Sequence, residues 1–319
     1  MFHPVAMPYV APLTLDTADL WFRIGTRPAG GDPVHEAIAE QLTSDSPDRF
    51  RLLLAFDDDV QAVGRVVARC WPSGRLTFWC PVLSEALSEA RQASIVACLI
   101  EACIQLGRQQ GCTFVEVAVD EFAVARPVLR AVLDTCRFDI AAEMVVLERA
   151  ASTSPSPSAA SRFSVVPGTA LSAERLERLF AKCEIGSLDR ANARRDKSRT
   201  RFADYLSPGS SSADRALWRI CQQGARPVGM VIPEALSGQT TGHIDYIGVV
   251  PQARRQGVGA RLLGSALTVL SERHMGVVRS AVDRINVPSL KLHQSFGFAP
   301  VFGTAVHHLT LWSELPAIL

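Results

Sequence analysis

The sequence has almost no net charge and no long apolar run. It carries 33 basic and 32 acidic side chains over 319 residues, for a formal net charge of +1. This balance gives no general attraction to nucleic acid or to anionic membranes. The richest apolar stretch, Ala93–Leu106, is interrupted by Glu101 and is shorter than the roughly 18 residues of a membrane span. We therefore expect no nucleic-acid and no membrane partner, and any anion binding must come from a local group of residues.

The sequence also lacks metal-binding and export patterns. Its eight cysteines include no C-x-x-C pair, and most of them stand in apolar patterns where cysteine acts as a small hydrophobe. The beginning of the sequence has neither the basic start nor the apolar stretch of a signal peptide. Both observations favour a reduced, cytoplasmic protein. His307 and His308 are adjacent and would face opposite sides of a strand, so we expect no metal site.

A segment without charged residues divides the chain. Residues 150–161 read AASTSPSPSAAS, a composition that cannot bury a core and is typical of a linker. The sequence thus predicts a first domain over residues 1–149, a linker over residues 150–161 and a second domain over residues 162–319.

The two halves share short patterns in the same order. Val63-Gly64 returns as Val228-Gly229, 165 positions later, and Ala118-Val119-Asp120 returns as Ala281-Val282-Asp283, 163 positions later. This order indicates an internal duplication. In each half, strands alternate with helices in a way that favours an α+β fold, with a central mixed, mostly antiparallel sheet flanked by helices.

The most informative stretch is VVPQARRQGVGARLL, residues 249–263. Here the end of an expected strand meets the start of an expected helix. A helix N-terminus has backbone N–H groups without partners and a partial positive charge, which together bind phosphates. Gly257 and Gly259 would let a pyrophosphate approach the backbone, and Arg254 and Arg255 would add donors beside it.

Two better-known phosphate motifs do not fit this stretch. The dinucleotide pattern G-x-G-x-x-G requires a third glycine where the sequence has Leu262, and the string G-x-x-x-x-G-K-[ST] of a P-loop does not occur.

The stretch resembles the pyrophosphate loop of the GNAT N-acetyltransferase superfamily, Arg/Gln-x-x-Gly-x-Gly/Ala after the fourth strand. A second stretch, NVPSLKLHQSFGF, is similar to the Asn-x-x-Ala/Ser-x-x-Leu-Tyr-x-x-x-Gly-Phe motif of that family. Its local features agree, because Asn286 can cap a helix and Pro288 fits a first turn. The resemblance implies two tandem domains, of which the second is catalytic. The first half has two glutamates and no glycine where the loop should be, so we expect it to be a degenerate copy that binds no coenzyme A.

The resemblance implies acetyl-CoA as co-substrate and a small-molecule or peptide amine as acceptor. Its cofactor-binding residues carry over to Val249, Val250, Arg254, Arg255, Gln256, Gly257, Val258, Gly259, Ala260, Asn286 and Ser289.

Three residues are candidates for the proton chemistry. Strand alternation would place His243, Asp245 and Ile247 on one face of the strand GHIDYIGVV, where His243 could act as base and Asp245 could raise its basicity or bind a cationic amine. The resemblance puts His293 where the family has a tyrosine that protonates the leaving thiolate. We therefore expect an acetyltransferase that works by direct attack of the amine. Transfer of another acyl group, or a non-catalytic acyl-CoA sensor, remain the alternatives.

Overall fold

The structure is a computed structural model. It describes residues 8–14, 17–21, 24, 50–57, 59–84, 87–123, 126–151, 162–190, 201–207, 213–235 and 240–311. The predicted linker lies outside these residues from position 152 to position 161. Within the described part of the chain, no helix has the length and apolar character needed to cross a bilayer.

The chain divides into two compact units. The first contains Met1–Ala141 and Ala305–Leu319, and the second contains Ala142–Thr304. The last strand of each half therefore contributes residues to both units, a division that the predicted boundaries at 149 and 162 did not include.

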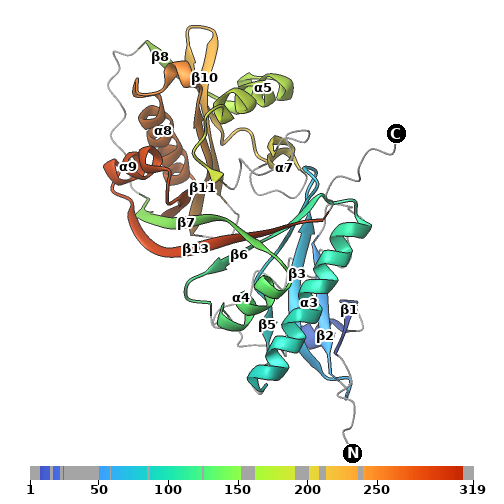
Figure 1. Cartoon of the computed structure of the whole chain (residues 1–319). Coiled ribbons are helices and arrows are strands. Elements are labelled where there is room, and N and C mark those ends of the chain that lie inside the picture. Colours follow the sequence, from blue (N-terminus) through green and yellow to red (C-terminus); the bar gives the residue numbers. More distant parts are fainter. Residues whose placement is uncertain are drawn as a thin grey trace, which may run out of the picture. The chain divides into compact units, whose positions relative to one another are not determined.

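The first half contains the elements β1 Tyr9–Pro12, α1 Ala18–Trp21, β2 Arg51–Phe56, β3 Ala62–Cys70, β4 Arg75–Phe78, β5 Val82–Leu83, α3 Glu89–Gln109, β6 Phe114–Asp120, α4 Arg126–Thr135 and β7 Asp139–Ala150 (Figure 1). The second half contains β8 Phe163–Pro167, η2 Gly168–Ala170, α5 Ala173–Glu184, α7 Phe202–Leu206, β9 Arg219–Gln223, β10 Arg226–Ala235, β11 Thr241–Val249, η3 Pro251–Ala253, α8 Val258–Glu272, β12 Val277–Asp283, α9 Val287–Ser295 and β13 Ala299–Thr310.

The order of elements repeats, as the duplicated patterns predict. Apart from β5 and the short η3, the succession β2-β3-β4-α3-β6-α4-β7 of the first half returns as β9-β10-β11-α8-β12-α9-β13 in the second. In each unit three antiparallel strands are followed by a parallel pairing across the helical crossover, β4 with β6 and β11 with β12. The mixed α+β fold expected from the sequence is confirmed.

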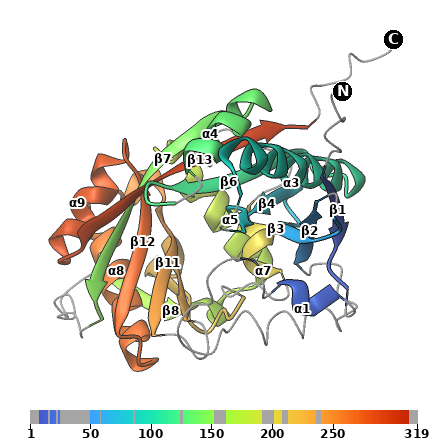
Figure 2. The ribbon, with the colours of Figure 1, turned by 90° about the horizontal axis from the view of Figure 1, so that it is seen from below.

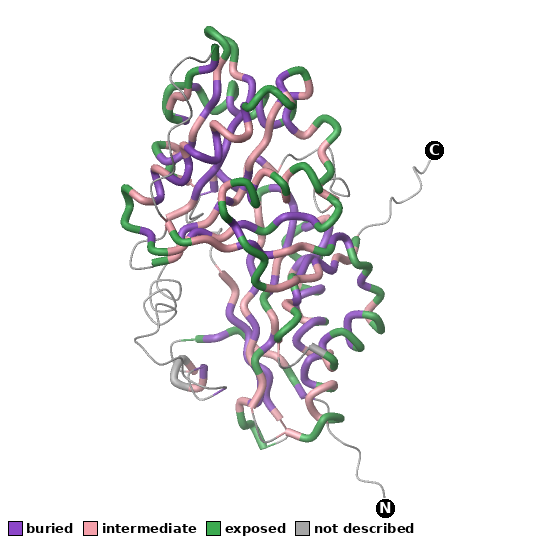
Figure 3. The backbone as a smooth tube through the Cα atoms, turned by 90° about the vertical axis from the view of Figure 1, so that its left-hand side faces the viewer, coloured by how far each residue is buried: buried purple, intermediate pink, exposed green. Residues whose placement is uncertain are grey.

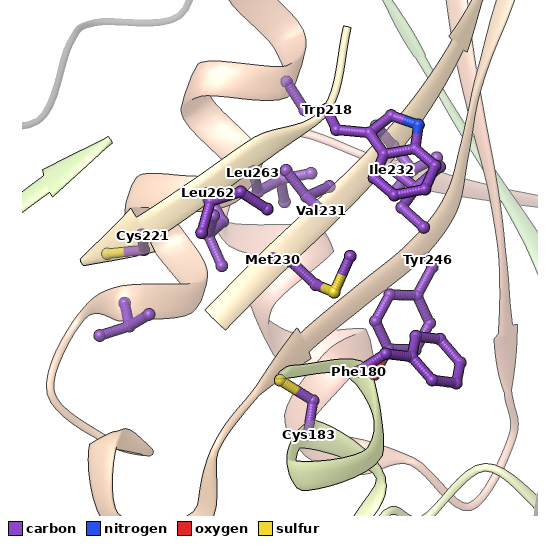
Figure 4. Packing of buried hydrophobic residues seen from close by; sticks show 14 of the residues in the cluster. Phe180, Cys183, Trp218, Cys221, Met230, Val231, Ile232, Tyr246, Leu262 and Leu263 are labelled. Carbon is purple, nitrogen blue, oxygen red and sulfur yellow. The ribbon is translucent and has the colours of Figure 1, made fainter. Parts of the chain in front are cut away.

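The second unit holds a six-strand order of β7-β12-β11-β10-β9-β8. Figure 2 shows β7, β12 and β11 side by side, in agreement with their pairing. Helix α8 packs on one face of β10 and β11, and α5 packs on the other. In Figure 4, Leu262 and Leu263 of α8 lie on the side of Val231, while Phe180 and Cys183 of α5 lie on the side of Tyr246. Figure 3 marks the buried residues in purple along the backbone.

The two halves differ where the cofactor loop is expected. All four residues of β4 pair with β6, from Arg75–Phe114 to Phe78–Val117. Helix α3 begins after Ser88 with an acidic residue, Glu89, in its first turn. The first half thus has neither a separation of these two strands nor a glycine-rich helix start, which fits a copy that lacks the anion-binding features.

Candidate active site

The start of α8 presents free backbone donors. Its N-cap is Gly257, and no side chain caps the helix. The first intrahelical bond of the described loop and helix is from Arg261 N–H to Gly257 O, at 3.1 Å. In the described structure, the amides of Val258, Gly259 and Ala260 therefore donate to no protein group. Three converging N–H groups at a helix N-terminus form a binding site for an anion.

The two glycines of the loop serve different purposes. Gly257 has φ of +80°, and a Cβ atom there would meet nothing within 4 Å, so glycine is needed for backbone conformation. A Cβ atom on Gly259 would stand 3.2 Å from Leu292 of α9, so glycine here lets α9 pack close to the helix start. Arg255 also takes a positive φ, +61°, which is uncommon for a residue with a side chain and occurs at ligand-binding turns.

An opening in the sheet leads away from this helix start. Pairing between β11 and β12 covers only Thr241–Val277 to Ile244–Ser280, whereas β12 remains paired with β7 as far as Asp283. Residues 245–249 therefore have no strand partner on the β12 side. A cavity of about 560 Å³ occupies this opening, bounded by both strands, the start of α8, helix α9 and the end of α5.

The backbone of β11 directs amides into the cavity. Val250 N–H donates to Val228 O on β10, at 3.0 Å. Because neighbouring residues of an antiparallel strand point their N–H groups to opposite sides, the amides of Val249 and Ile247 point away from β10 and toward the opening. The structure thus provides backbone donors inside the opening, at Ile247 and Val249.

A β-bulge at Asp245 changes the faces of β11. The pairing register runs from Tyr246–Ile232 to Ile244–Pro233 and leaves Asp245 without an opposite residue. Gly242 accordingly faces Leu270 of α8, while Gly248 faces Cys183 of α5. With regular alternation these two glycines, six residues apart, would share a face. The prediction that His243, Asp245 and Ile247 share one face was therefore wrong, because Ile247 lies on the α8 side and His243 on the α5 side.

His243 lies outside the cavity lining. It stands in the part of β11 that is still paired, opposite Arg279 of β12 and Glu234 of β10. Burial lowers the pKa of His243, the nearby Asp245 carboxylate opposes this shift, and Arg279 adds to it. Asp245, by contrast, lines the cavity.

His293 is a fully buried polar side chain of the site. It is 0% exposed and lines the cavity from α9. Its Nδ1 lies 2.8 Å from the carbonyl oxygen of Ser289, and since a carbonyl can only accept, Nδ1 carries the proton. In the described structure Nε2 is buried without a hydrogen-bond partner. Burial lowers the pKa of His293, and the bond to Ser289 opposes the shift. The neutral ring therefore offers an acceptor at Nε2.

Arg254 holds the loop against the end of α5. Its guanidinium donates to four carbonyl oxygens, those of Val249 (3.0 Å), Cys183 (2.9 Å), Ile185 (2.6 Å) and Gly186 (3.1 Å). Since a helix C-terminus carries unpaired carbonyls and a partial negative charge, a guanidinium there is stabilising. The donors that the sequence assigned to a phosphate are thus committed to the protein backbone.

Sequence reasoning missed two pairs beside the cavity. Tyr246 donates its hydroxyl to Glu184 at 2.9 Å, and burial raises the pKa of Tyr246 well above its usual value, as does Glu184. Arg190 donates three hydrogen bonds of 3.0–3.1 Å to the carboxylate of Asp283. The pairs join residues 62 and 93 positions apart, and no local pattern announces either of them.

The remaining predicted residues divide into lining and supporting positions. Asn286 caps α9 by accepting from Ser289 N–H at 3.3 Å, as predicted, and both residues line the cavity. Val250 and Val258 belong to the hydrophobic core. Gln256 is exposed, accepts from Arg162 and donates to the carbonyl of Gln252.

Comparison with known proteins agrees with this geometry. The family model described as "Acetyltransferase (GNAT) family" matches residues 174–298, a range that contains the opening, the start of α8 and α9. The second half of the chain is a GNAT domain. No curated protein matches the sequence.

Solved structures extend the likeness to the whole chain. A GCN5-related N-acetyltransferase from Sphaerobacter thermophilus superposes with a TM-score of 0.67 at 15% identity, covering 97% of each chain. A tandem GNAT protein of the clavulanic acid biosynthesis pathway gives 0.60 at 14% identity, covering 96% of this chain and 99% of the other. A region of a fungal β-N-acetylglucosaminidase, termed a glucosamine N-acetyltransferase region, gives 0.62 at 13% identity and covers 96% of this chain and 38% of the other. The chain therefore has the fold of the tandem GNAT proteins.

Proposed function

We propose that the protein transfers an acetyl group from acetyl-CoA to a primary amine, by direct attack of the amine on the thioester. The new C–N bond forms as the C–S bond breaks, and the thiolate of coenzyme A leaves and takes its proton from water. The observation that carries the proposal is the opening between β11 and β12, which begins at Asp245 and ends at the free amides of α8. One continuous cavity thus combines an anion site with inward-pointing strand amides.

The donor end of the cavity is basic and rich in free N–H groups. The amides of Val258, Gly259 and Ala260 would bind the diphosphate of coenzyme A, with the exposed Arg255 side chain beside them. The Val249 amide would hold the thioester carbonyl and the oxyanion that forms on attack. We assign Arg254 to holding the loop in place, because its donors already bind four carbonyls.

The acceptor end of the cavity is acidic. Four carboxylates line it, those of Glu184, Asp189, Asp245 and Asp283, and Arg190 pairs with Asp283. Carboxylates around a cavity favour a cationic ammonium group over a neutral or anionic acceptor. We assign proton acceptance to Asp245, directly or through a water molecule, rather than to His243, since Asp245 lines the cavity and His243 does not.

His293 takes a different part from the acid expected at its position. With the proton on Nδ1 held by Ser289 O, the Nε2 atom of the neutral ring has no proton to give. Protonating the ring would put a charge on a fully buried group. We propose that Nε2 accepts a hydrogen bond from the bound thiol or amide of coenzyme A and so positions the donor.

The test is a transfer assay with labelled acetyl-CoA and a panel of primary amines, amino sugars and peptides, with products identified by mass spectrometry. Acetylated amine should form with wild-type protein, and Asp245→Asn should slow turnover without weakening CoA binding. His243→Gln is the matched control and should keep near-normal turnover. CoA binding without turnover on any amine would favour an acyl-CoA sensor, and turnover only with longer donors would favour another acyl group.

A further inference from the structure

A second cavity of the C-terminal unit has a uniformly basic rim. It has a volume of about 450 Å³ and lies between α5, the start of β10 and the segment that follows β11. Arg175, Arg178 and Lys182 of α5 and Arg226 of β10 line it, and its lining contains no carboxylate. Four positive charges around one hollow are unexpected in a chain whose net charge is +1.

Three basic residues of α5 share one face of the helix. Arg175, Arg178 and Lys182 stand at positions i, i+3 and i+7 and so form one stripe, which faces the second cavity. Arg178 and Lys182 are like charges four residues apart, an arrangement that weakens a helix. Glu184 lines the first cavity instead.

Few of these cations are engaged by the protein. Arg178 lies 3.3 Å from Glu174, and both of these side chains are largely exposed. In the described structure, Arg175, Lys182 and Arg226 have no ion pair or side-chain hydrogen bond. Their charged groups are therefore available to a ligand.

The floor of the second cavity is apolar. Leu179 and Val250 are 2% and 3% exposed and lie at its base, while Pro227, Pro251 and the exposed Ile185 form its walls. An apolar floor beneath a cationic rim suits a ligand with an apolar body and two or more negative charges.

We propose that this second cavity is a binding site for a phosphorylated small molecule, with Lys182 and Arg226 as the main phosphate contacts. The end of α5 separates it from the first cavity, since Glu184 and Gly186 line the first and Lys182 and Ile185 the second. The same chemistry occurs in a separate phosphorylated ligand and in the 3′-phosphate end of coenzyme A.

Calorimetry with two probes distinguishes these sources. Inorganic pyrophosphate is titrated into the CoA-saturated protein, and CoA and dephospho-CoA are titrated into the free protein. The variant is K182Q/R226Q, which changes only exposed side chains, and the control is R273Q, an exposed arginine beside Asp214. Folding of each variant is checked by thermal unfolding.

If the ligand is separate from coenzyme A, wild-type and R273Q proteins should bind pyrophosphate in the presence of CoA. K182Q/R226Q should bind pyrophosphate at least tenfold more weakly and should keep the wild-type affinity for CoA. If coenzyme A itself occupies the cavity, the double variant should lose about tenfold in CoA affinity and nothing in dephospho-CoA affinity. Unchanged affinity for both CoA and pyrophosphate in K182Q/R226Q would overturn the proposal. If CoA does not bind at all, the proposed function fails, and pyrophosphate is then titrated into the free protein. Pyrophosphate binding that is lost in K182Q/R226Q would still support the second cavity as a phosphate site.

Discussion

Gly248 is the position where adding one methyl group should disturb the site most. A Cβ atom there would contact the hydroxyl oxygen of Tyr246 and would lie 2.7 Å from the Cζ of Tyr246 and 2.8 Å from the Cβ of Cys183. Contacts under 3.0 Å require movement of the neighbours, and these neighbours are buried core residues. The φ of Gly248 is not in the left-handed region, so the whole cost is one of space.

We predict that Gly248→Ala lowers the free energy of unfolding by about 2 kcal/mol, in the usual range of 1–3 kcal/mol for overpacking. For a unit of this size the midpoint of thermal unfolding should fall by about 4–8 °C. The matched control is Gly276→Ala, where the nearest atom to the new Cβ is Thr240 O at 3.7 Å and a change below about 0.5 kcal/mol is expected.

A double-mutant cycle tests the cause of this loss. Tyr246→Phe removes the hydroxyl that meets the new methyl group, so Gly248→Ala should cost about 1 kcal/mol less in that background. The measurement is urea unfolding followed by circular dichroism for wild type, both single variants and the double variant. Equal destabilisation by Gly248→Ala and Gly276→Ala, or no coupling with Tyr246, would refute the packing described for this part of β11.

Three further predictions concern the charged and titratable groups. Arg254→Gln should lower the free energy of unfolding by about 2 kcal/mol, because it removes charge-assisted bonds to carbonyls at the end of α5, while Arg255→Gln should leave stability unchanged in the same urea titration. Arg190→Gln should lower the midpoint of thermal unfolding, since it leaves the carboxylate of Asp283, whose side chain is 0% exposed, without its main partner. Burial lowers the pKa of His293 below 6.5, so the unfolded chain binds more protons than the folded protein as pH falls below 6.5, and the free energy of unfolding should decrease there. His293→Phe should show a smaller decrease between pH 7 and pH 5. An equal decrease in both proteins would contradict this assignment.

The same shift predicts the kinetic behaviour of His293. A ring that must be neutral to accept a hydrogen bond supports activity above its lowered pKa, so kcat should not fall as pH rises from 6.5 to 8. Loss of kcat over this range in the wild type, absent in His293→Phe, would restore the role of acid.

Local signals in the sequence were enough to predict the helix starts of the site. Gly257, Gly259 and the N-cap Asn286 affect the backbone within a few residues of themselves, so a short stretch of sequence is enough to predict a helix start. The structure confirms both helix starts. The repeated patterns likewise predicted the repeated order of elements, because each pattern belongs to one strand.

Features that depend on tertiary structure were not predictable in this way. The bulge at Asp245 is visible only through the partner strand β10, because the residues themselves still alternate regularly in the sequence. Arg254 was assigned to a phosphate because its nearest neighbours are loop residues, yet three of its four acceptors lie about 70 positions earlier in the chain. Both the bulge and the contacts of Arg254 arise between residues that are far apart in the sequence and are brought together by the fold.

The proposed function depends above all on the backbone amides at the start of α8, which we expect to bind the diphosphate of coenzyme A. The most direct measurement is an NMR titration of ¹⁵N-labelled protein with CoA, and with pantetheine as the ligand that lacks the diphosphate. CoA should produce its largest amide shifts at Val258, Gly259 and Ala260, and pantetheine should leave these three amides nearly unchanged. Shifts concentrated elsewhere with CoA, or equal shifts at these amides with both ligands, would contradict this expectation.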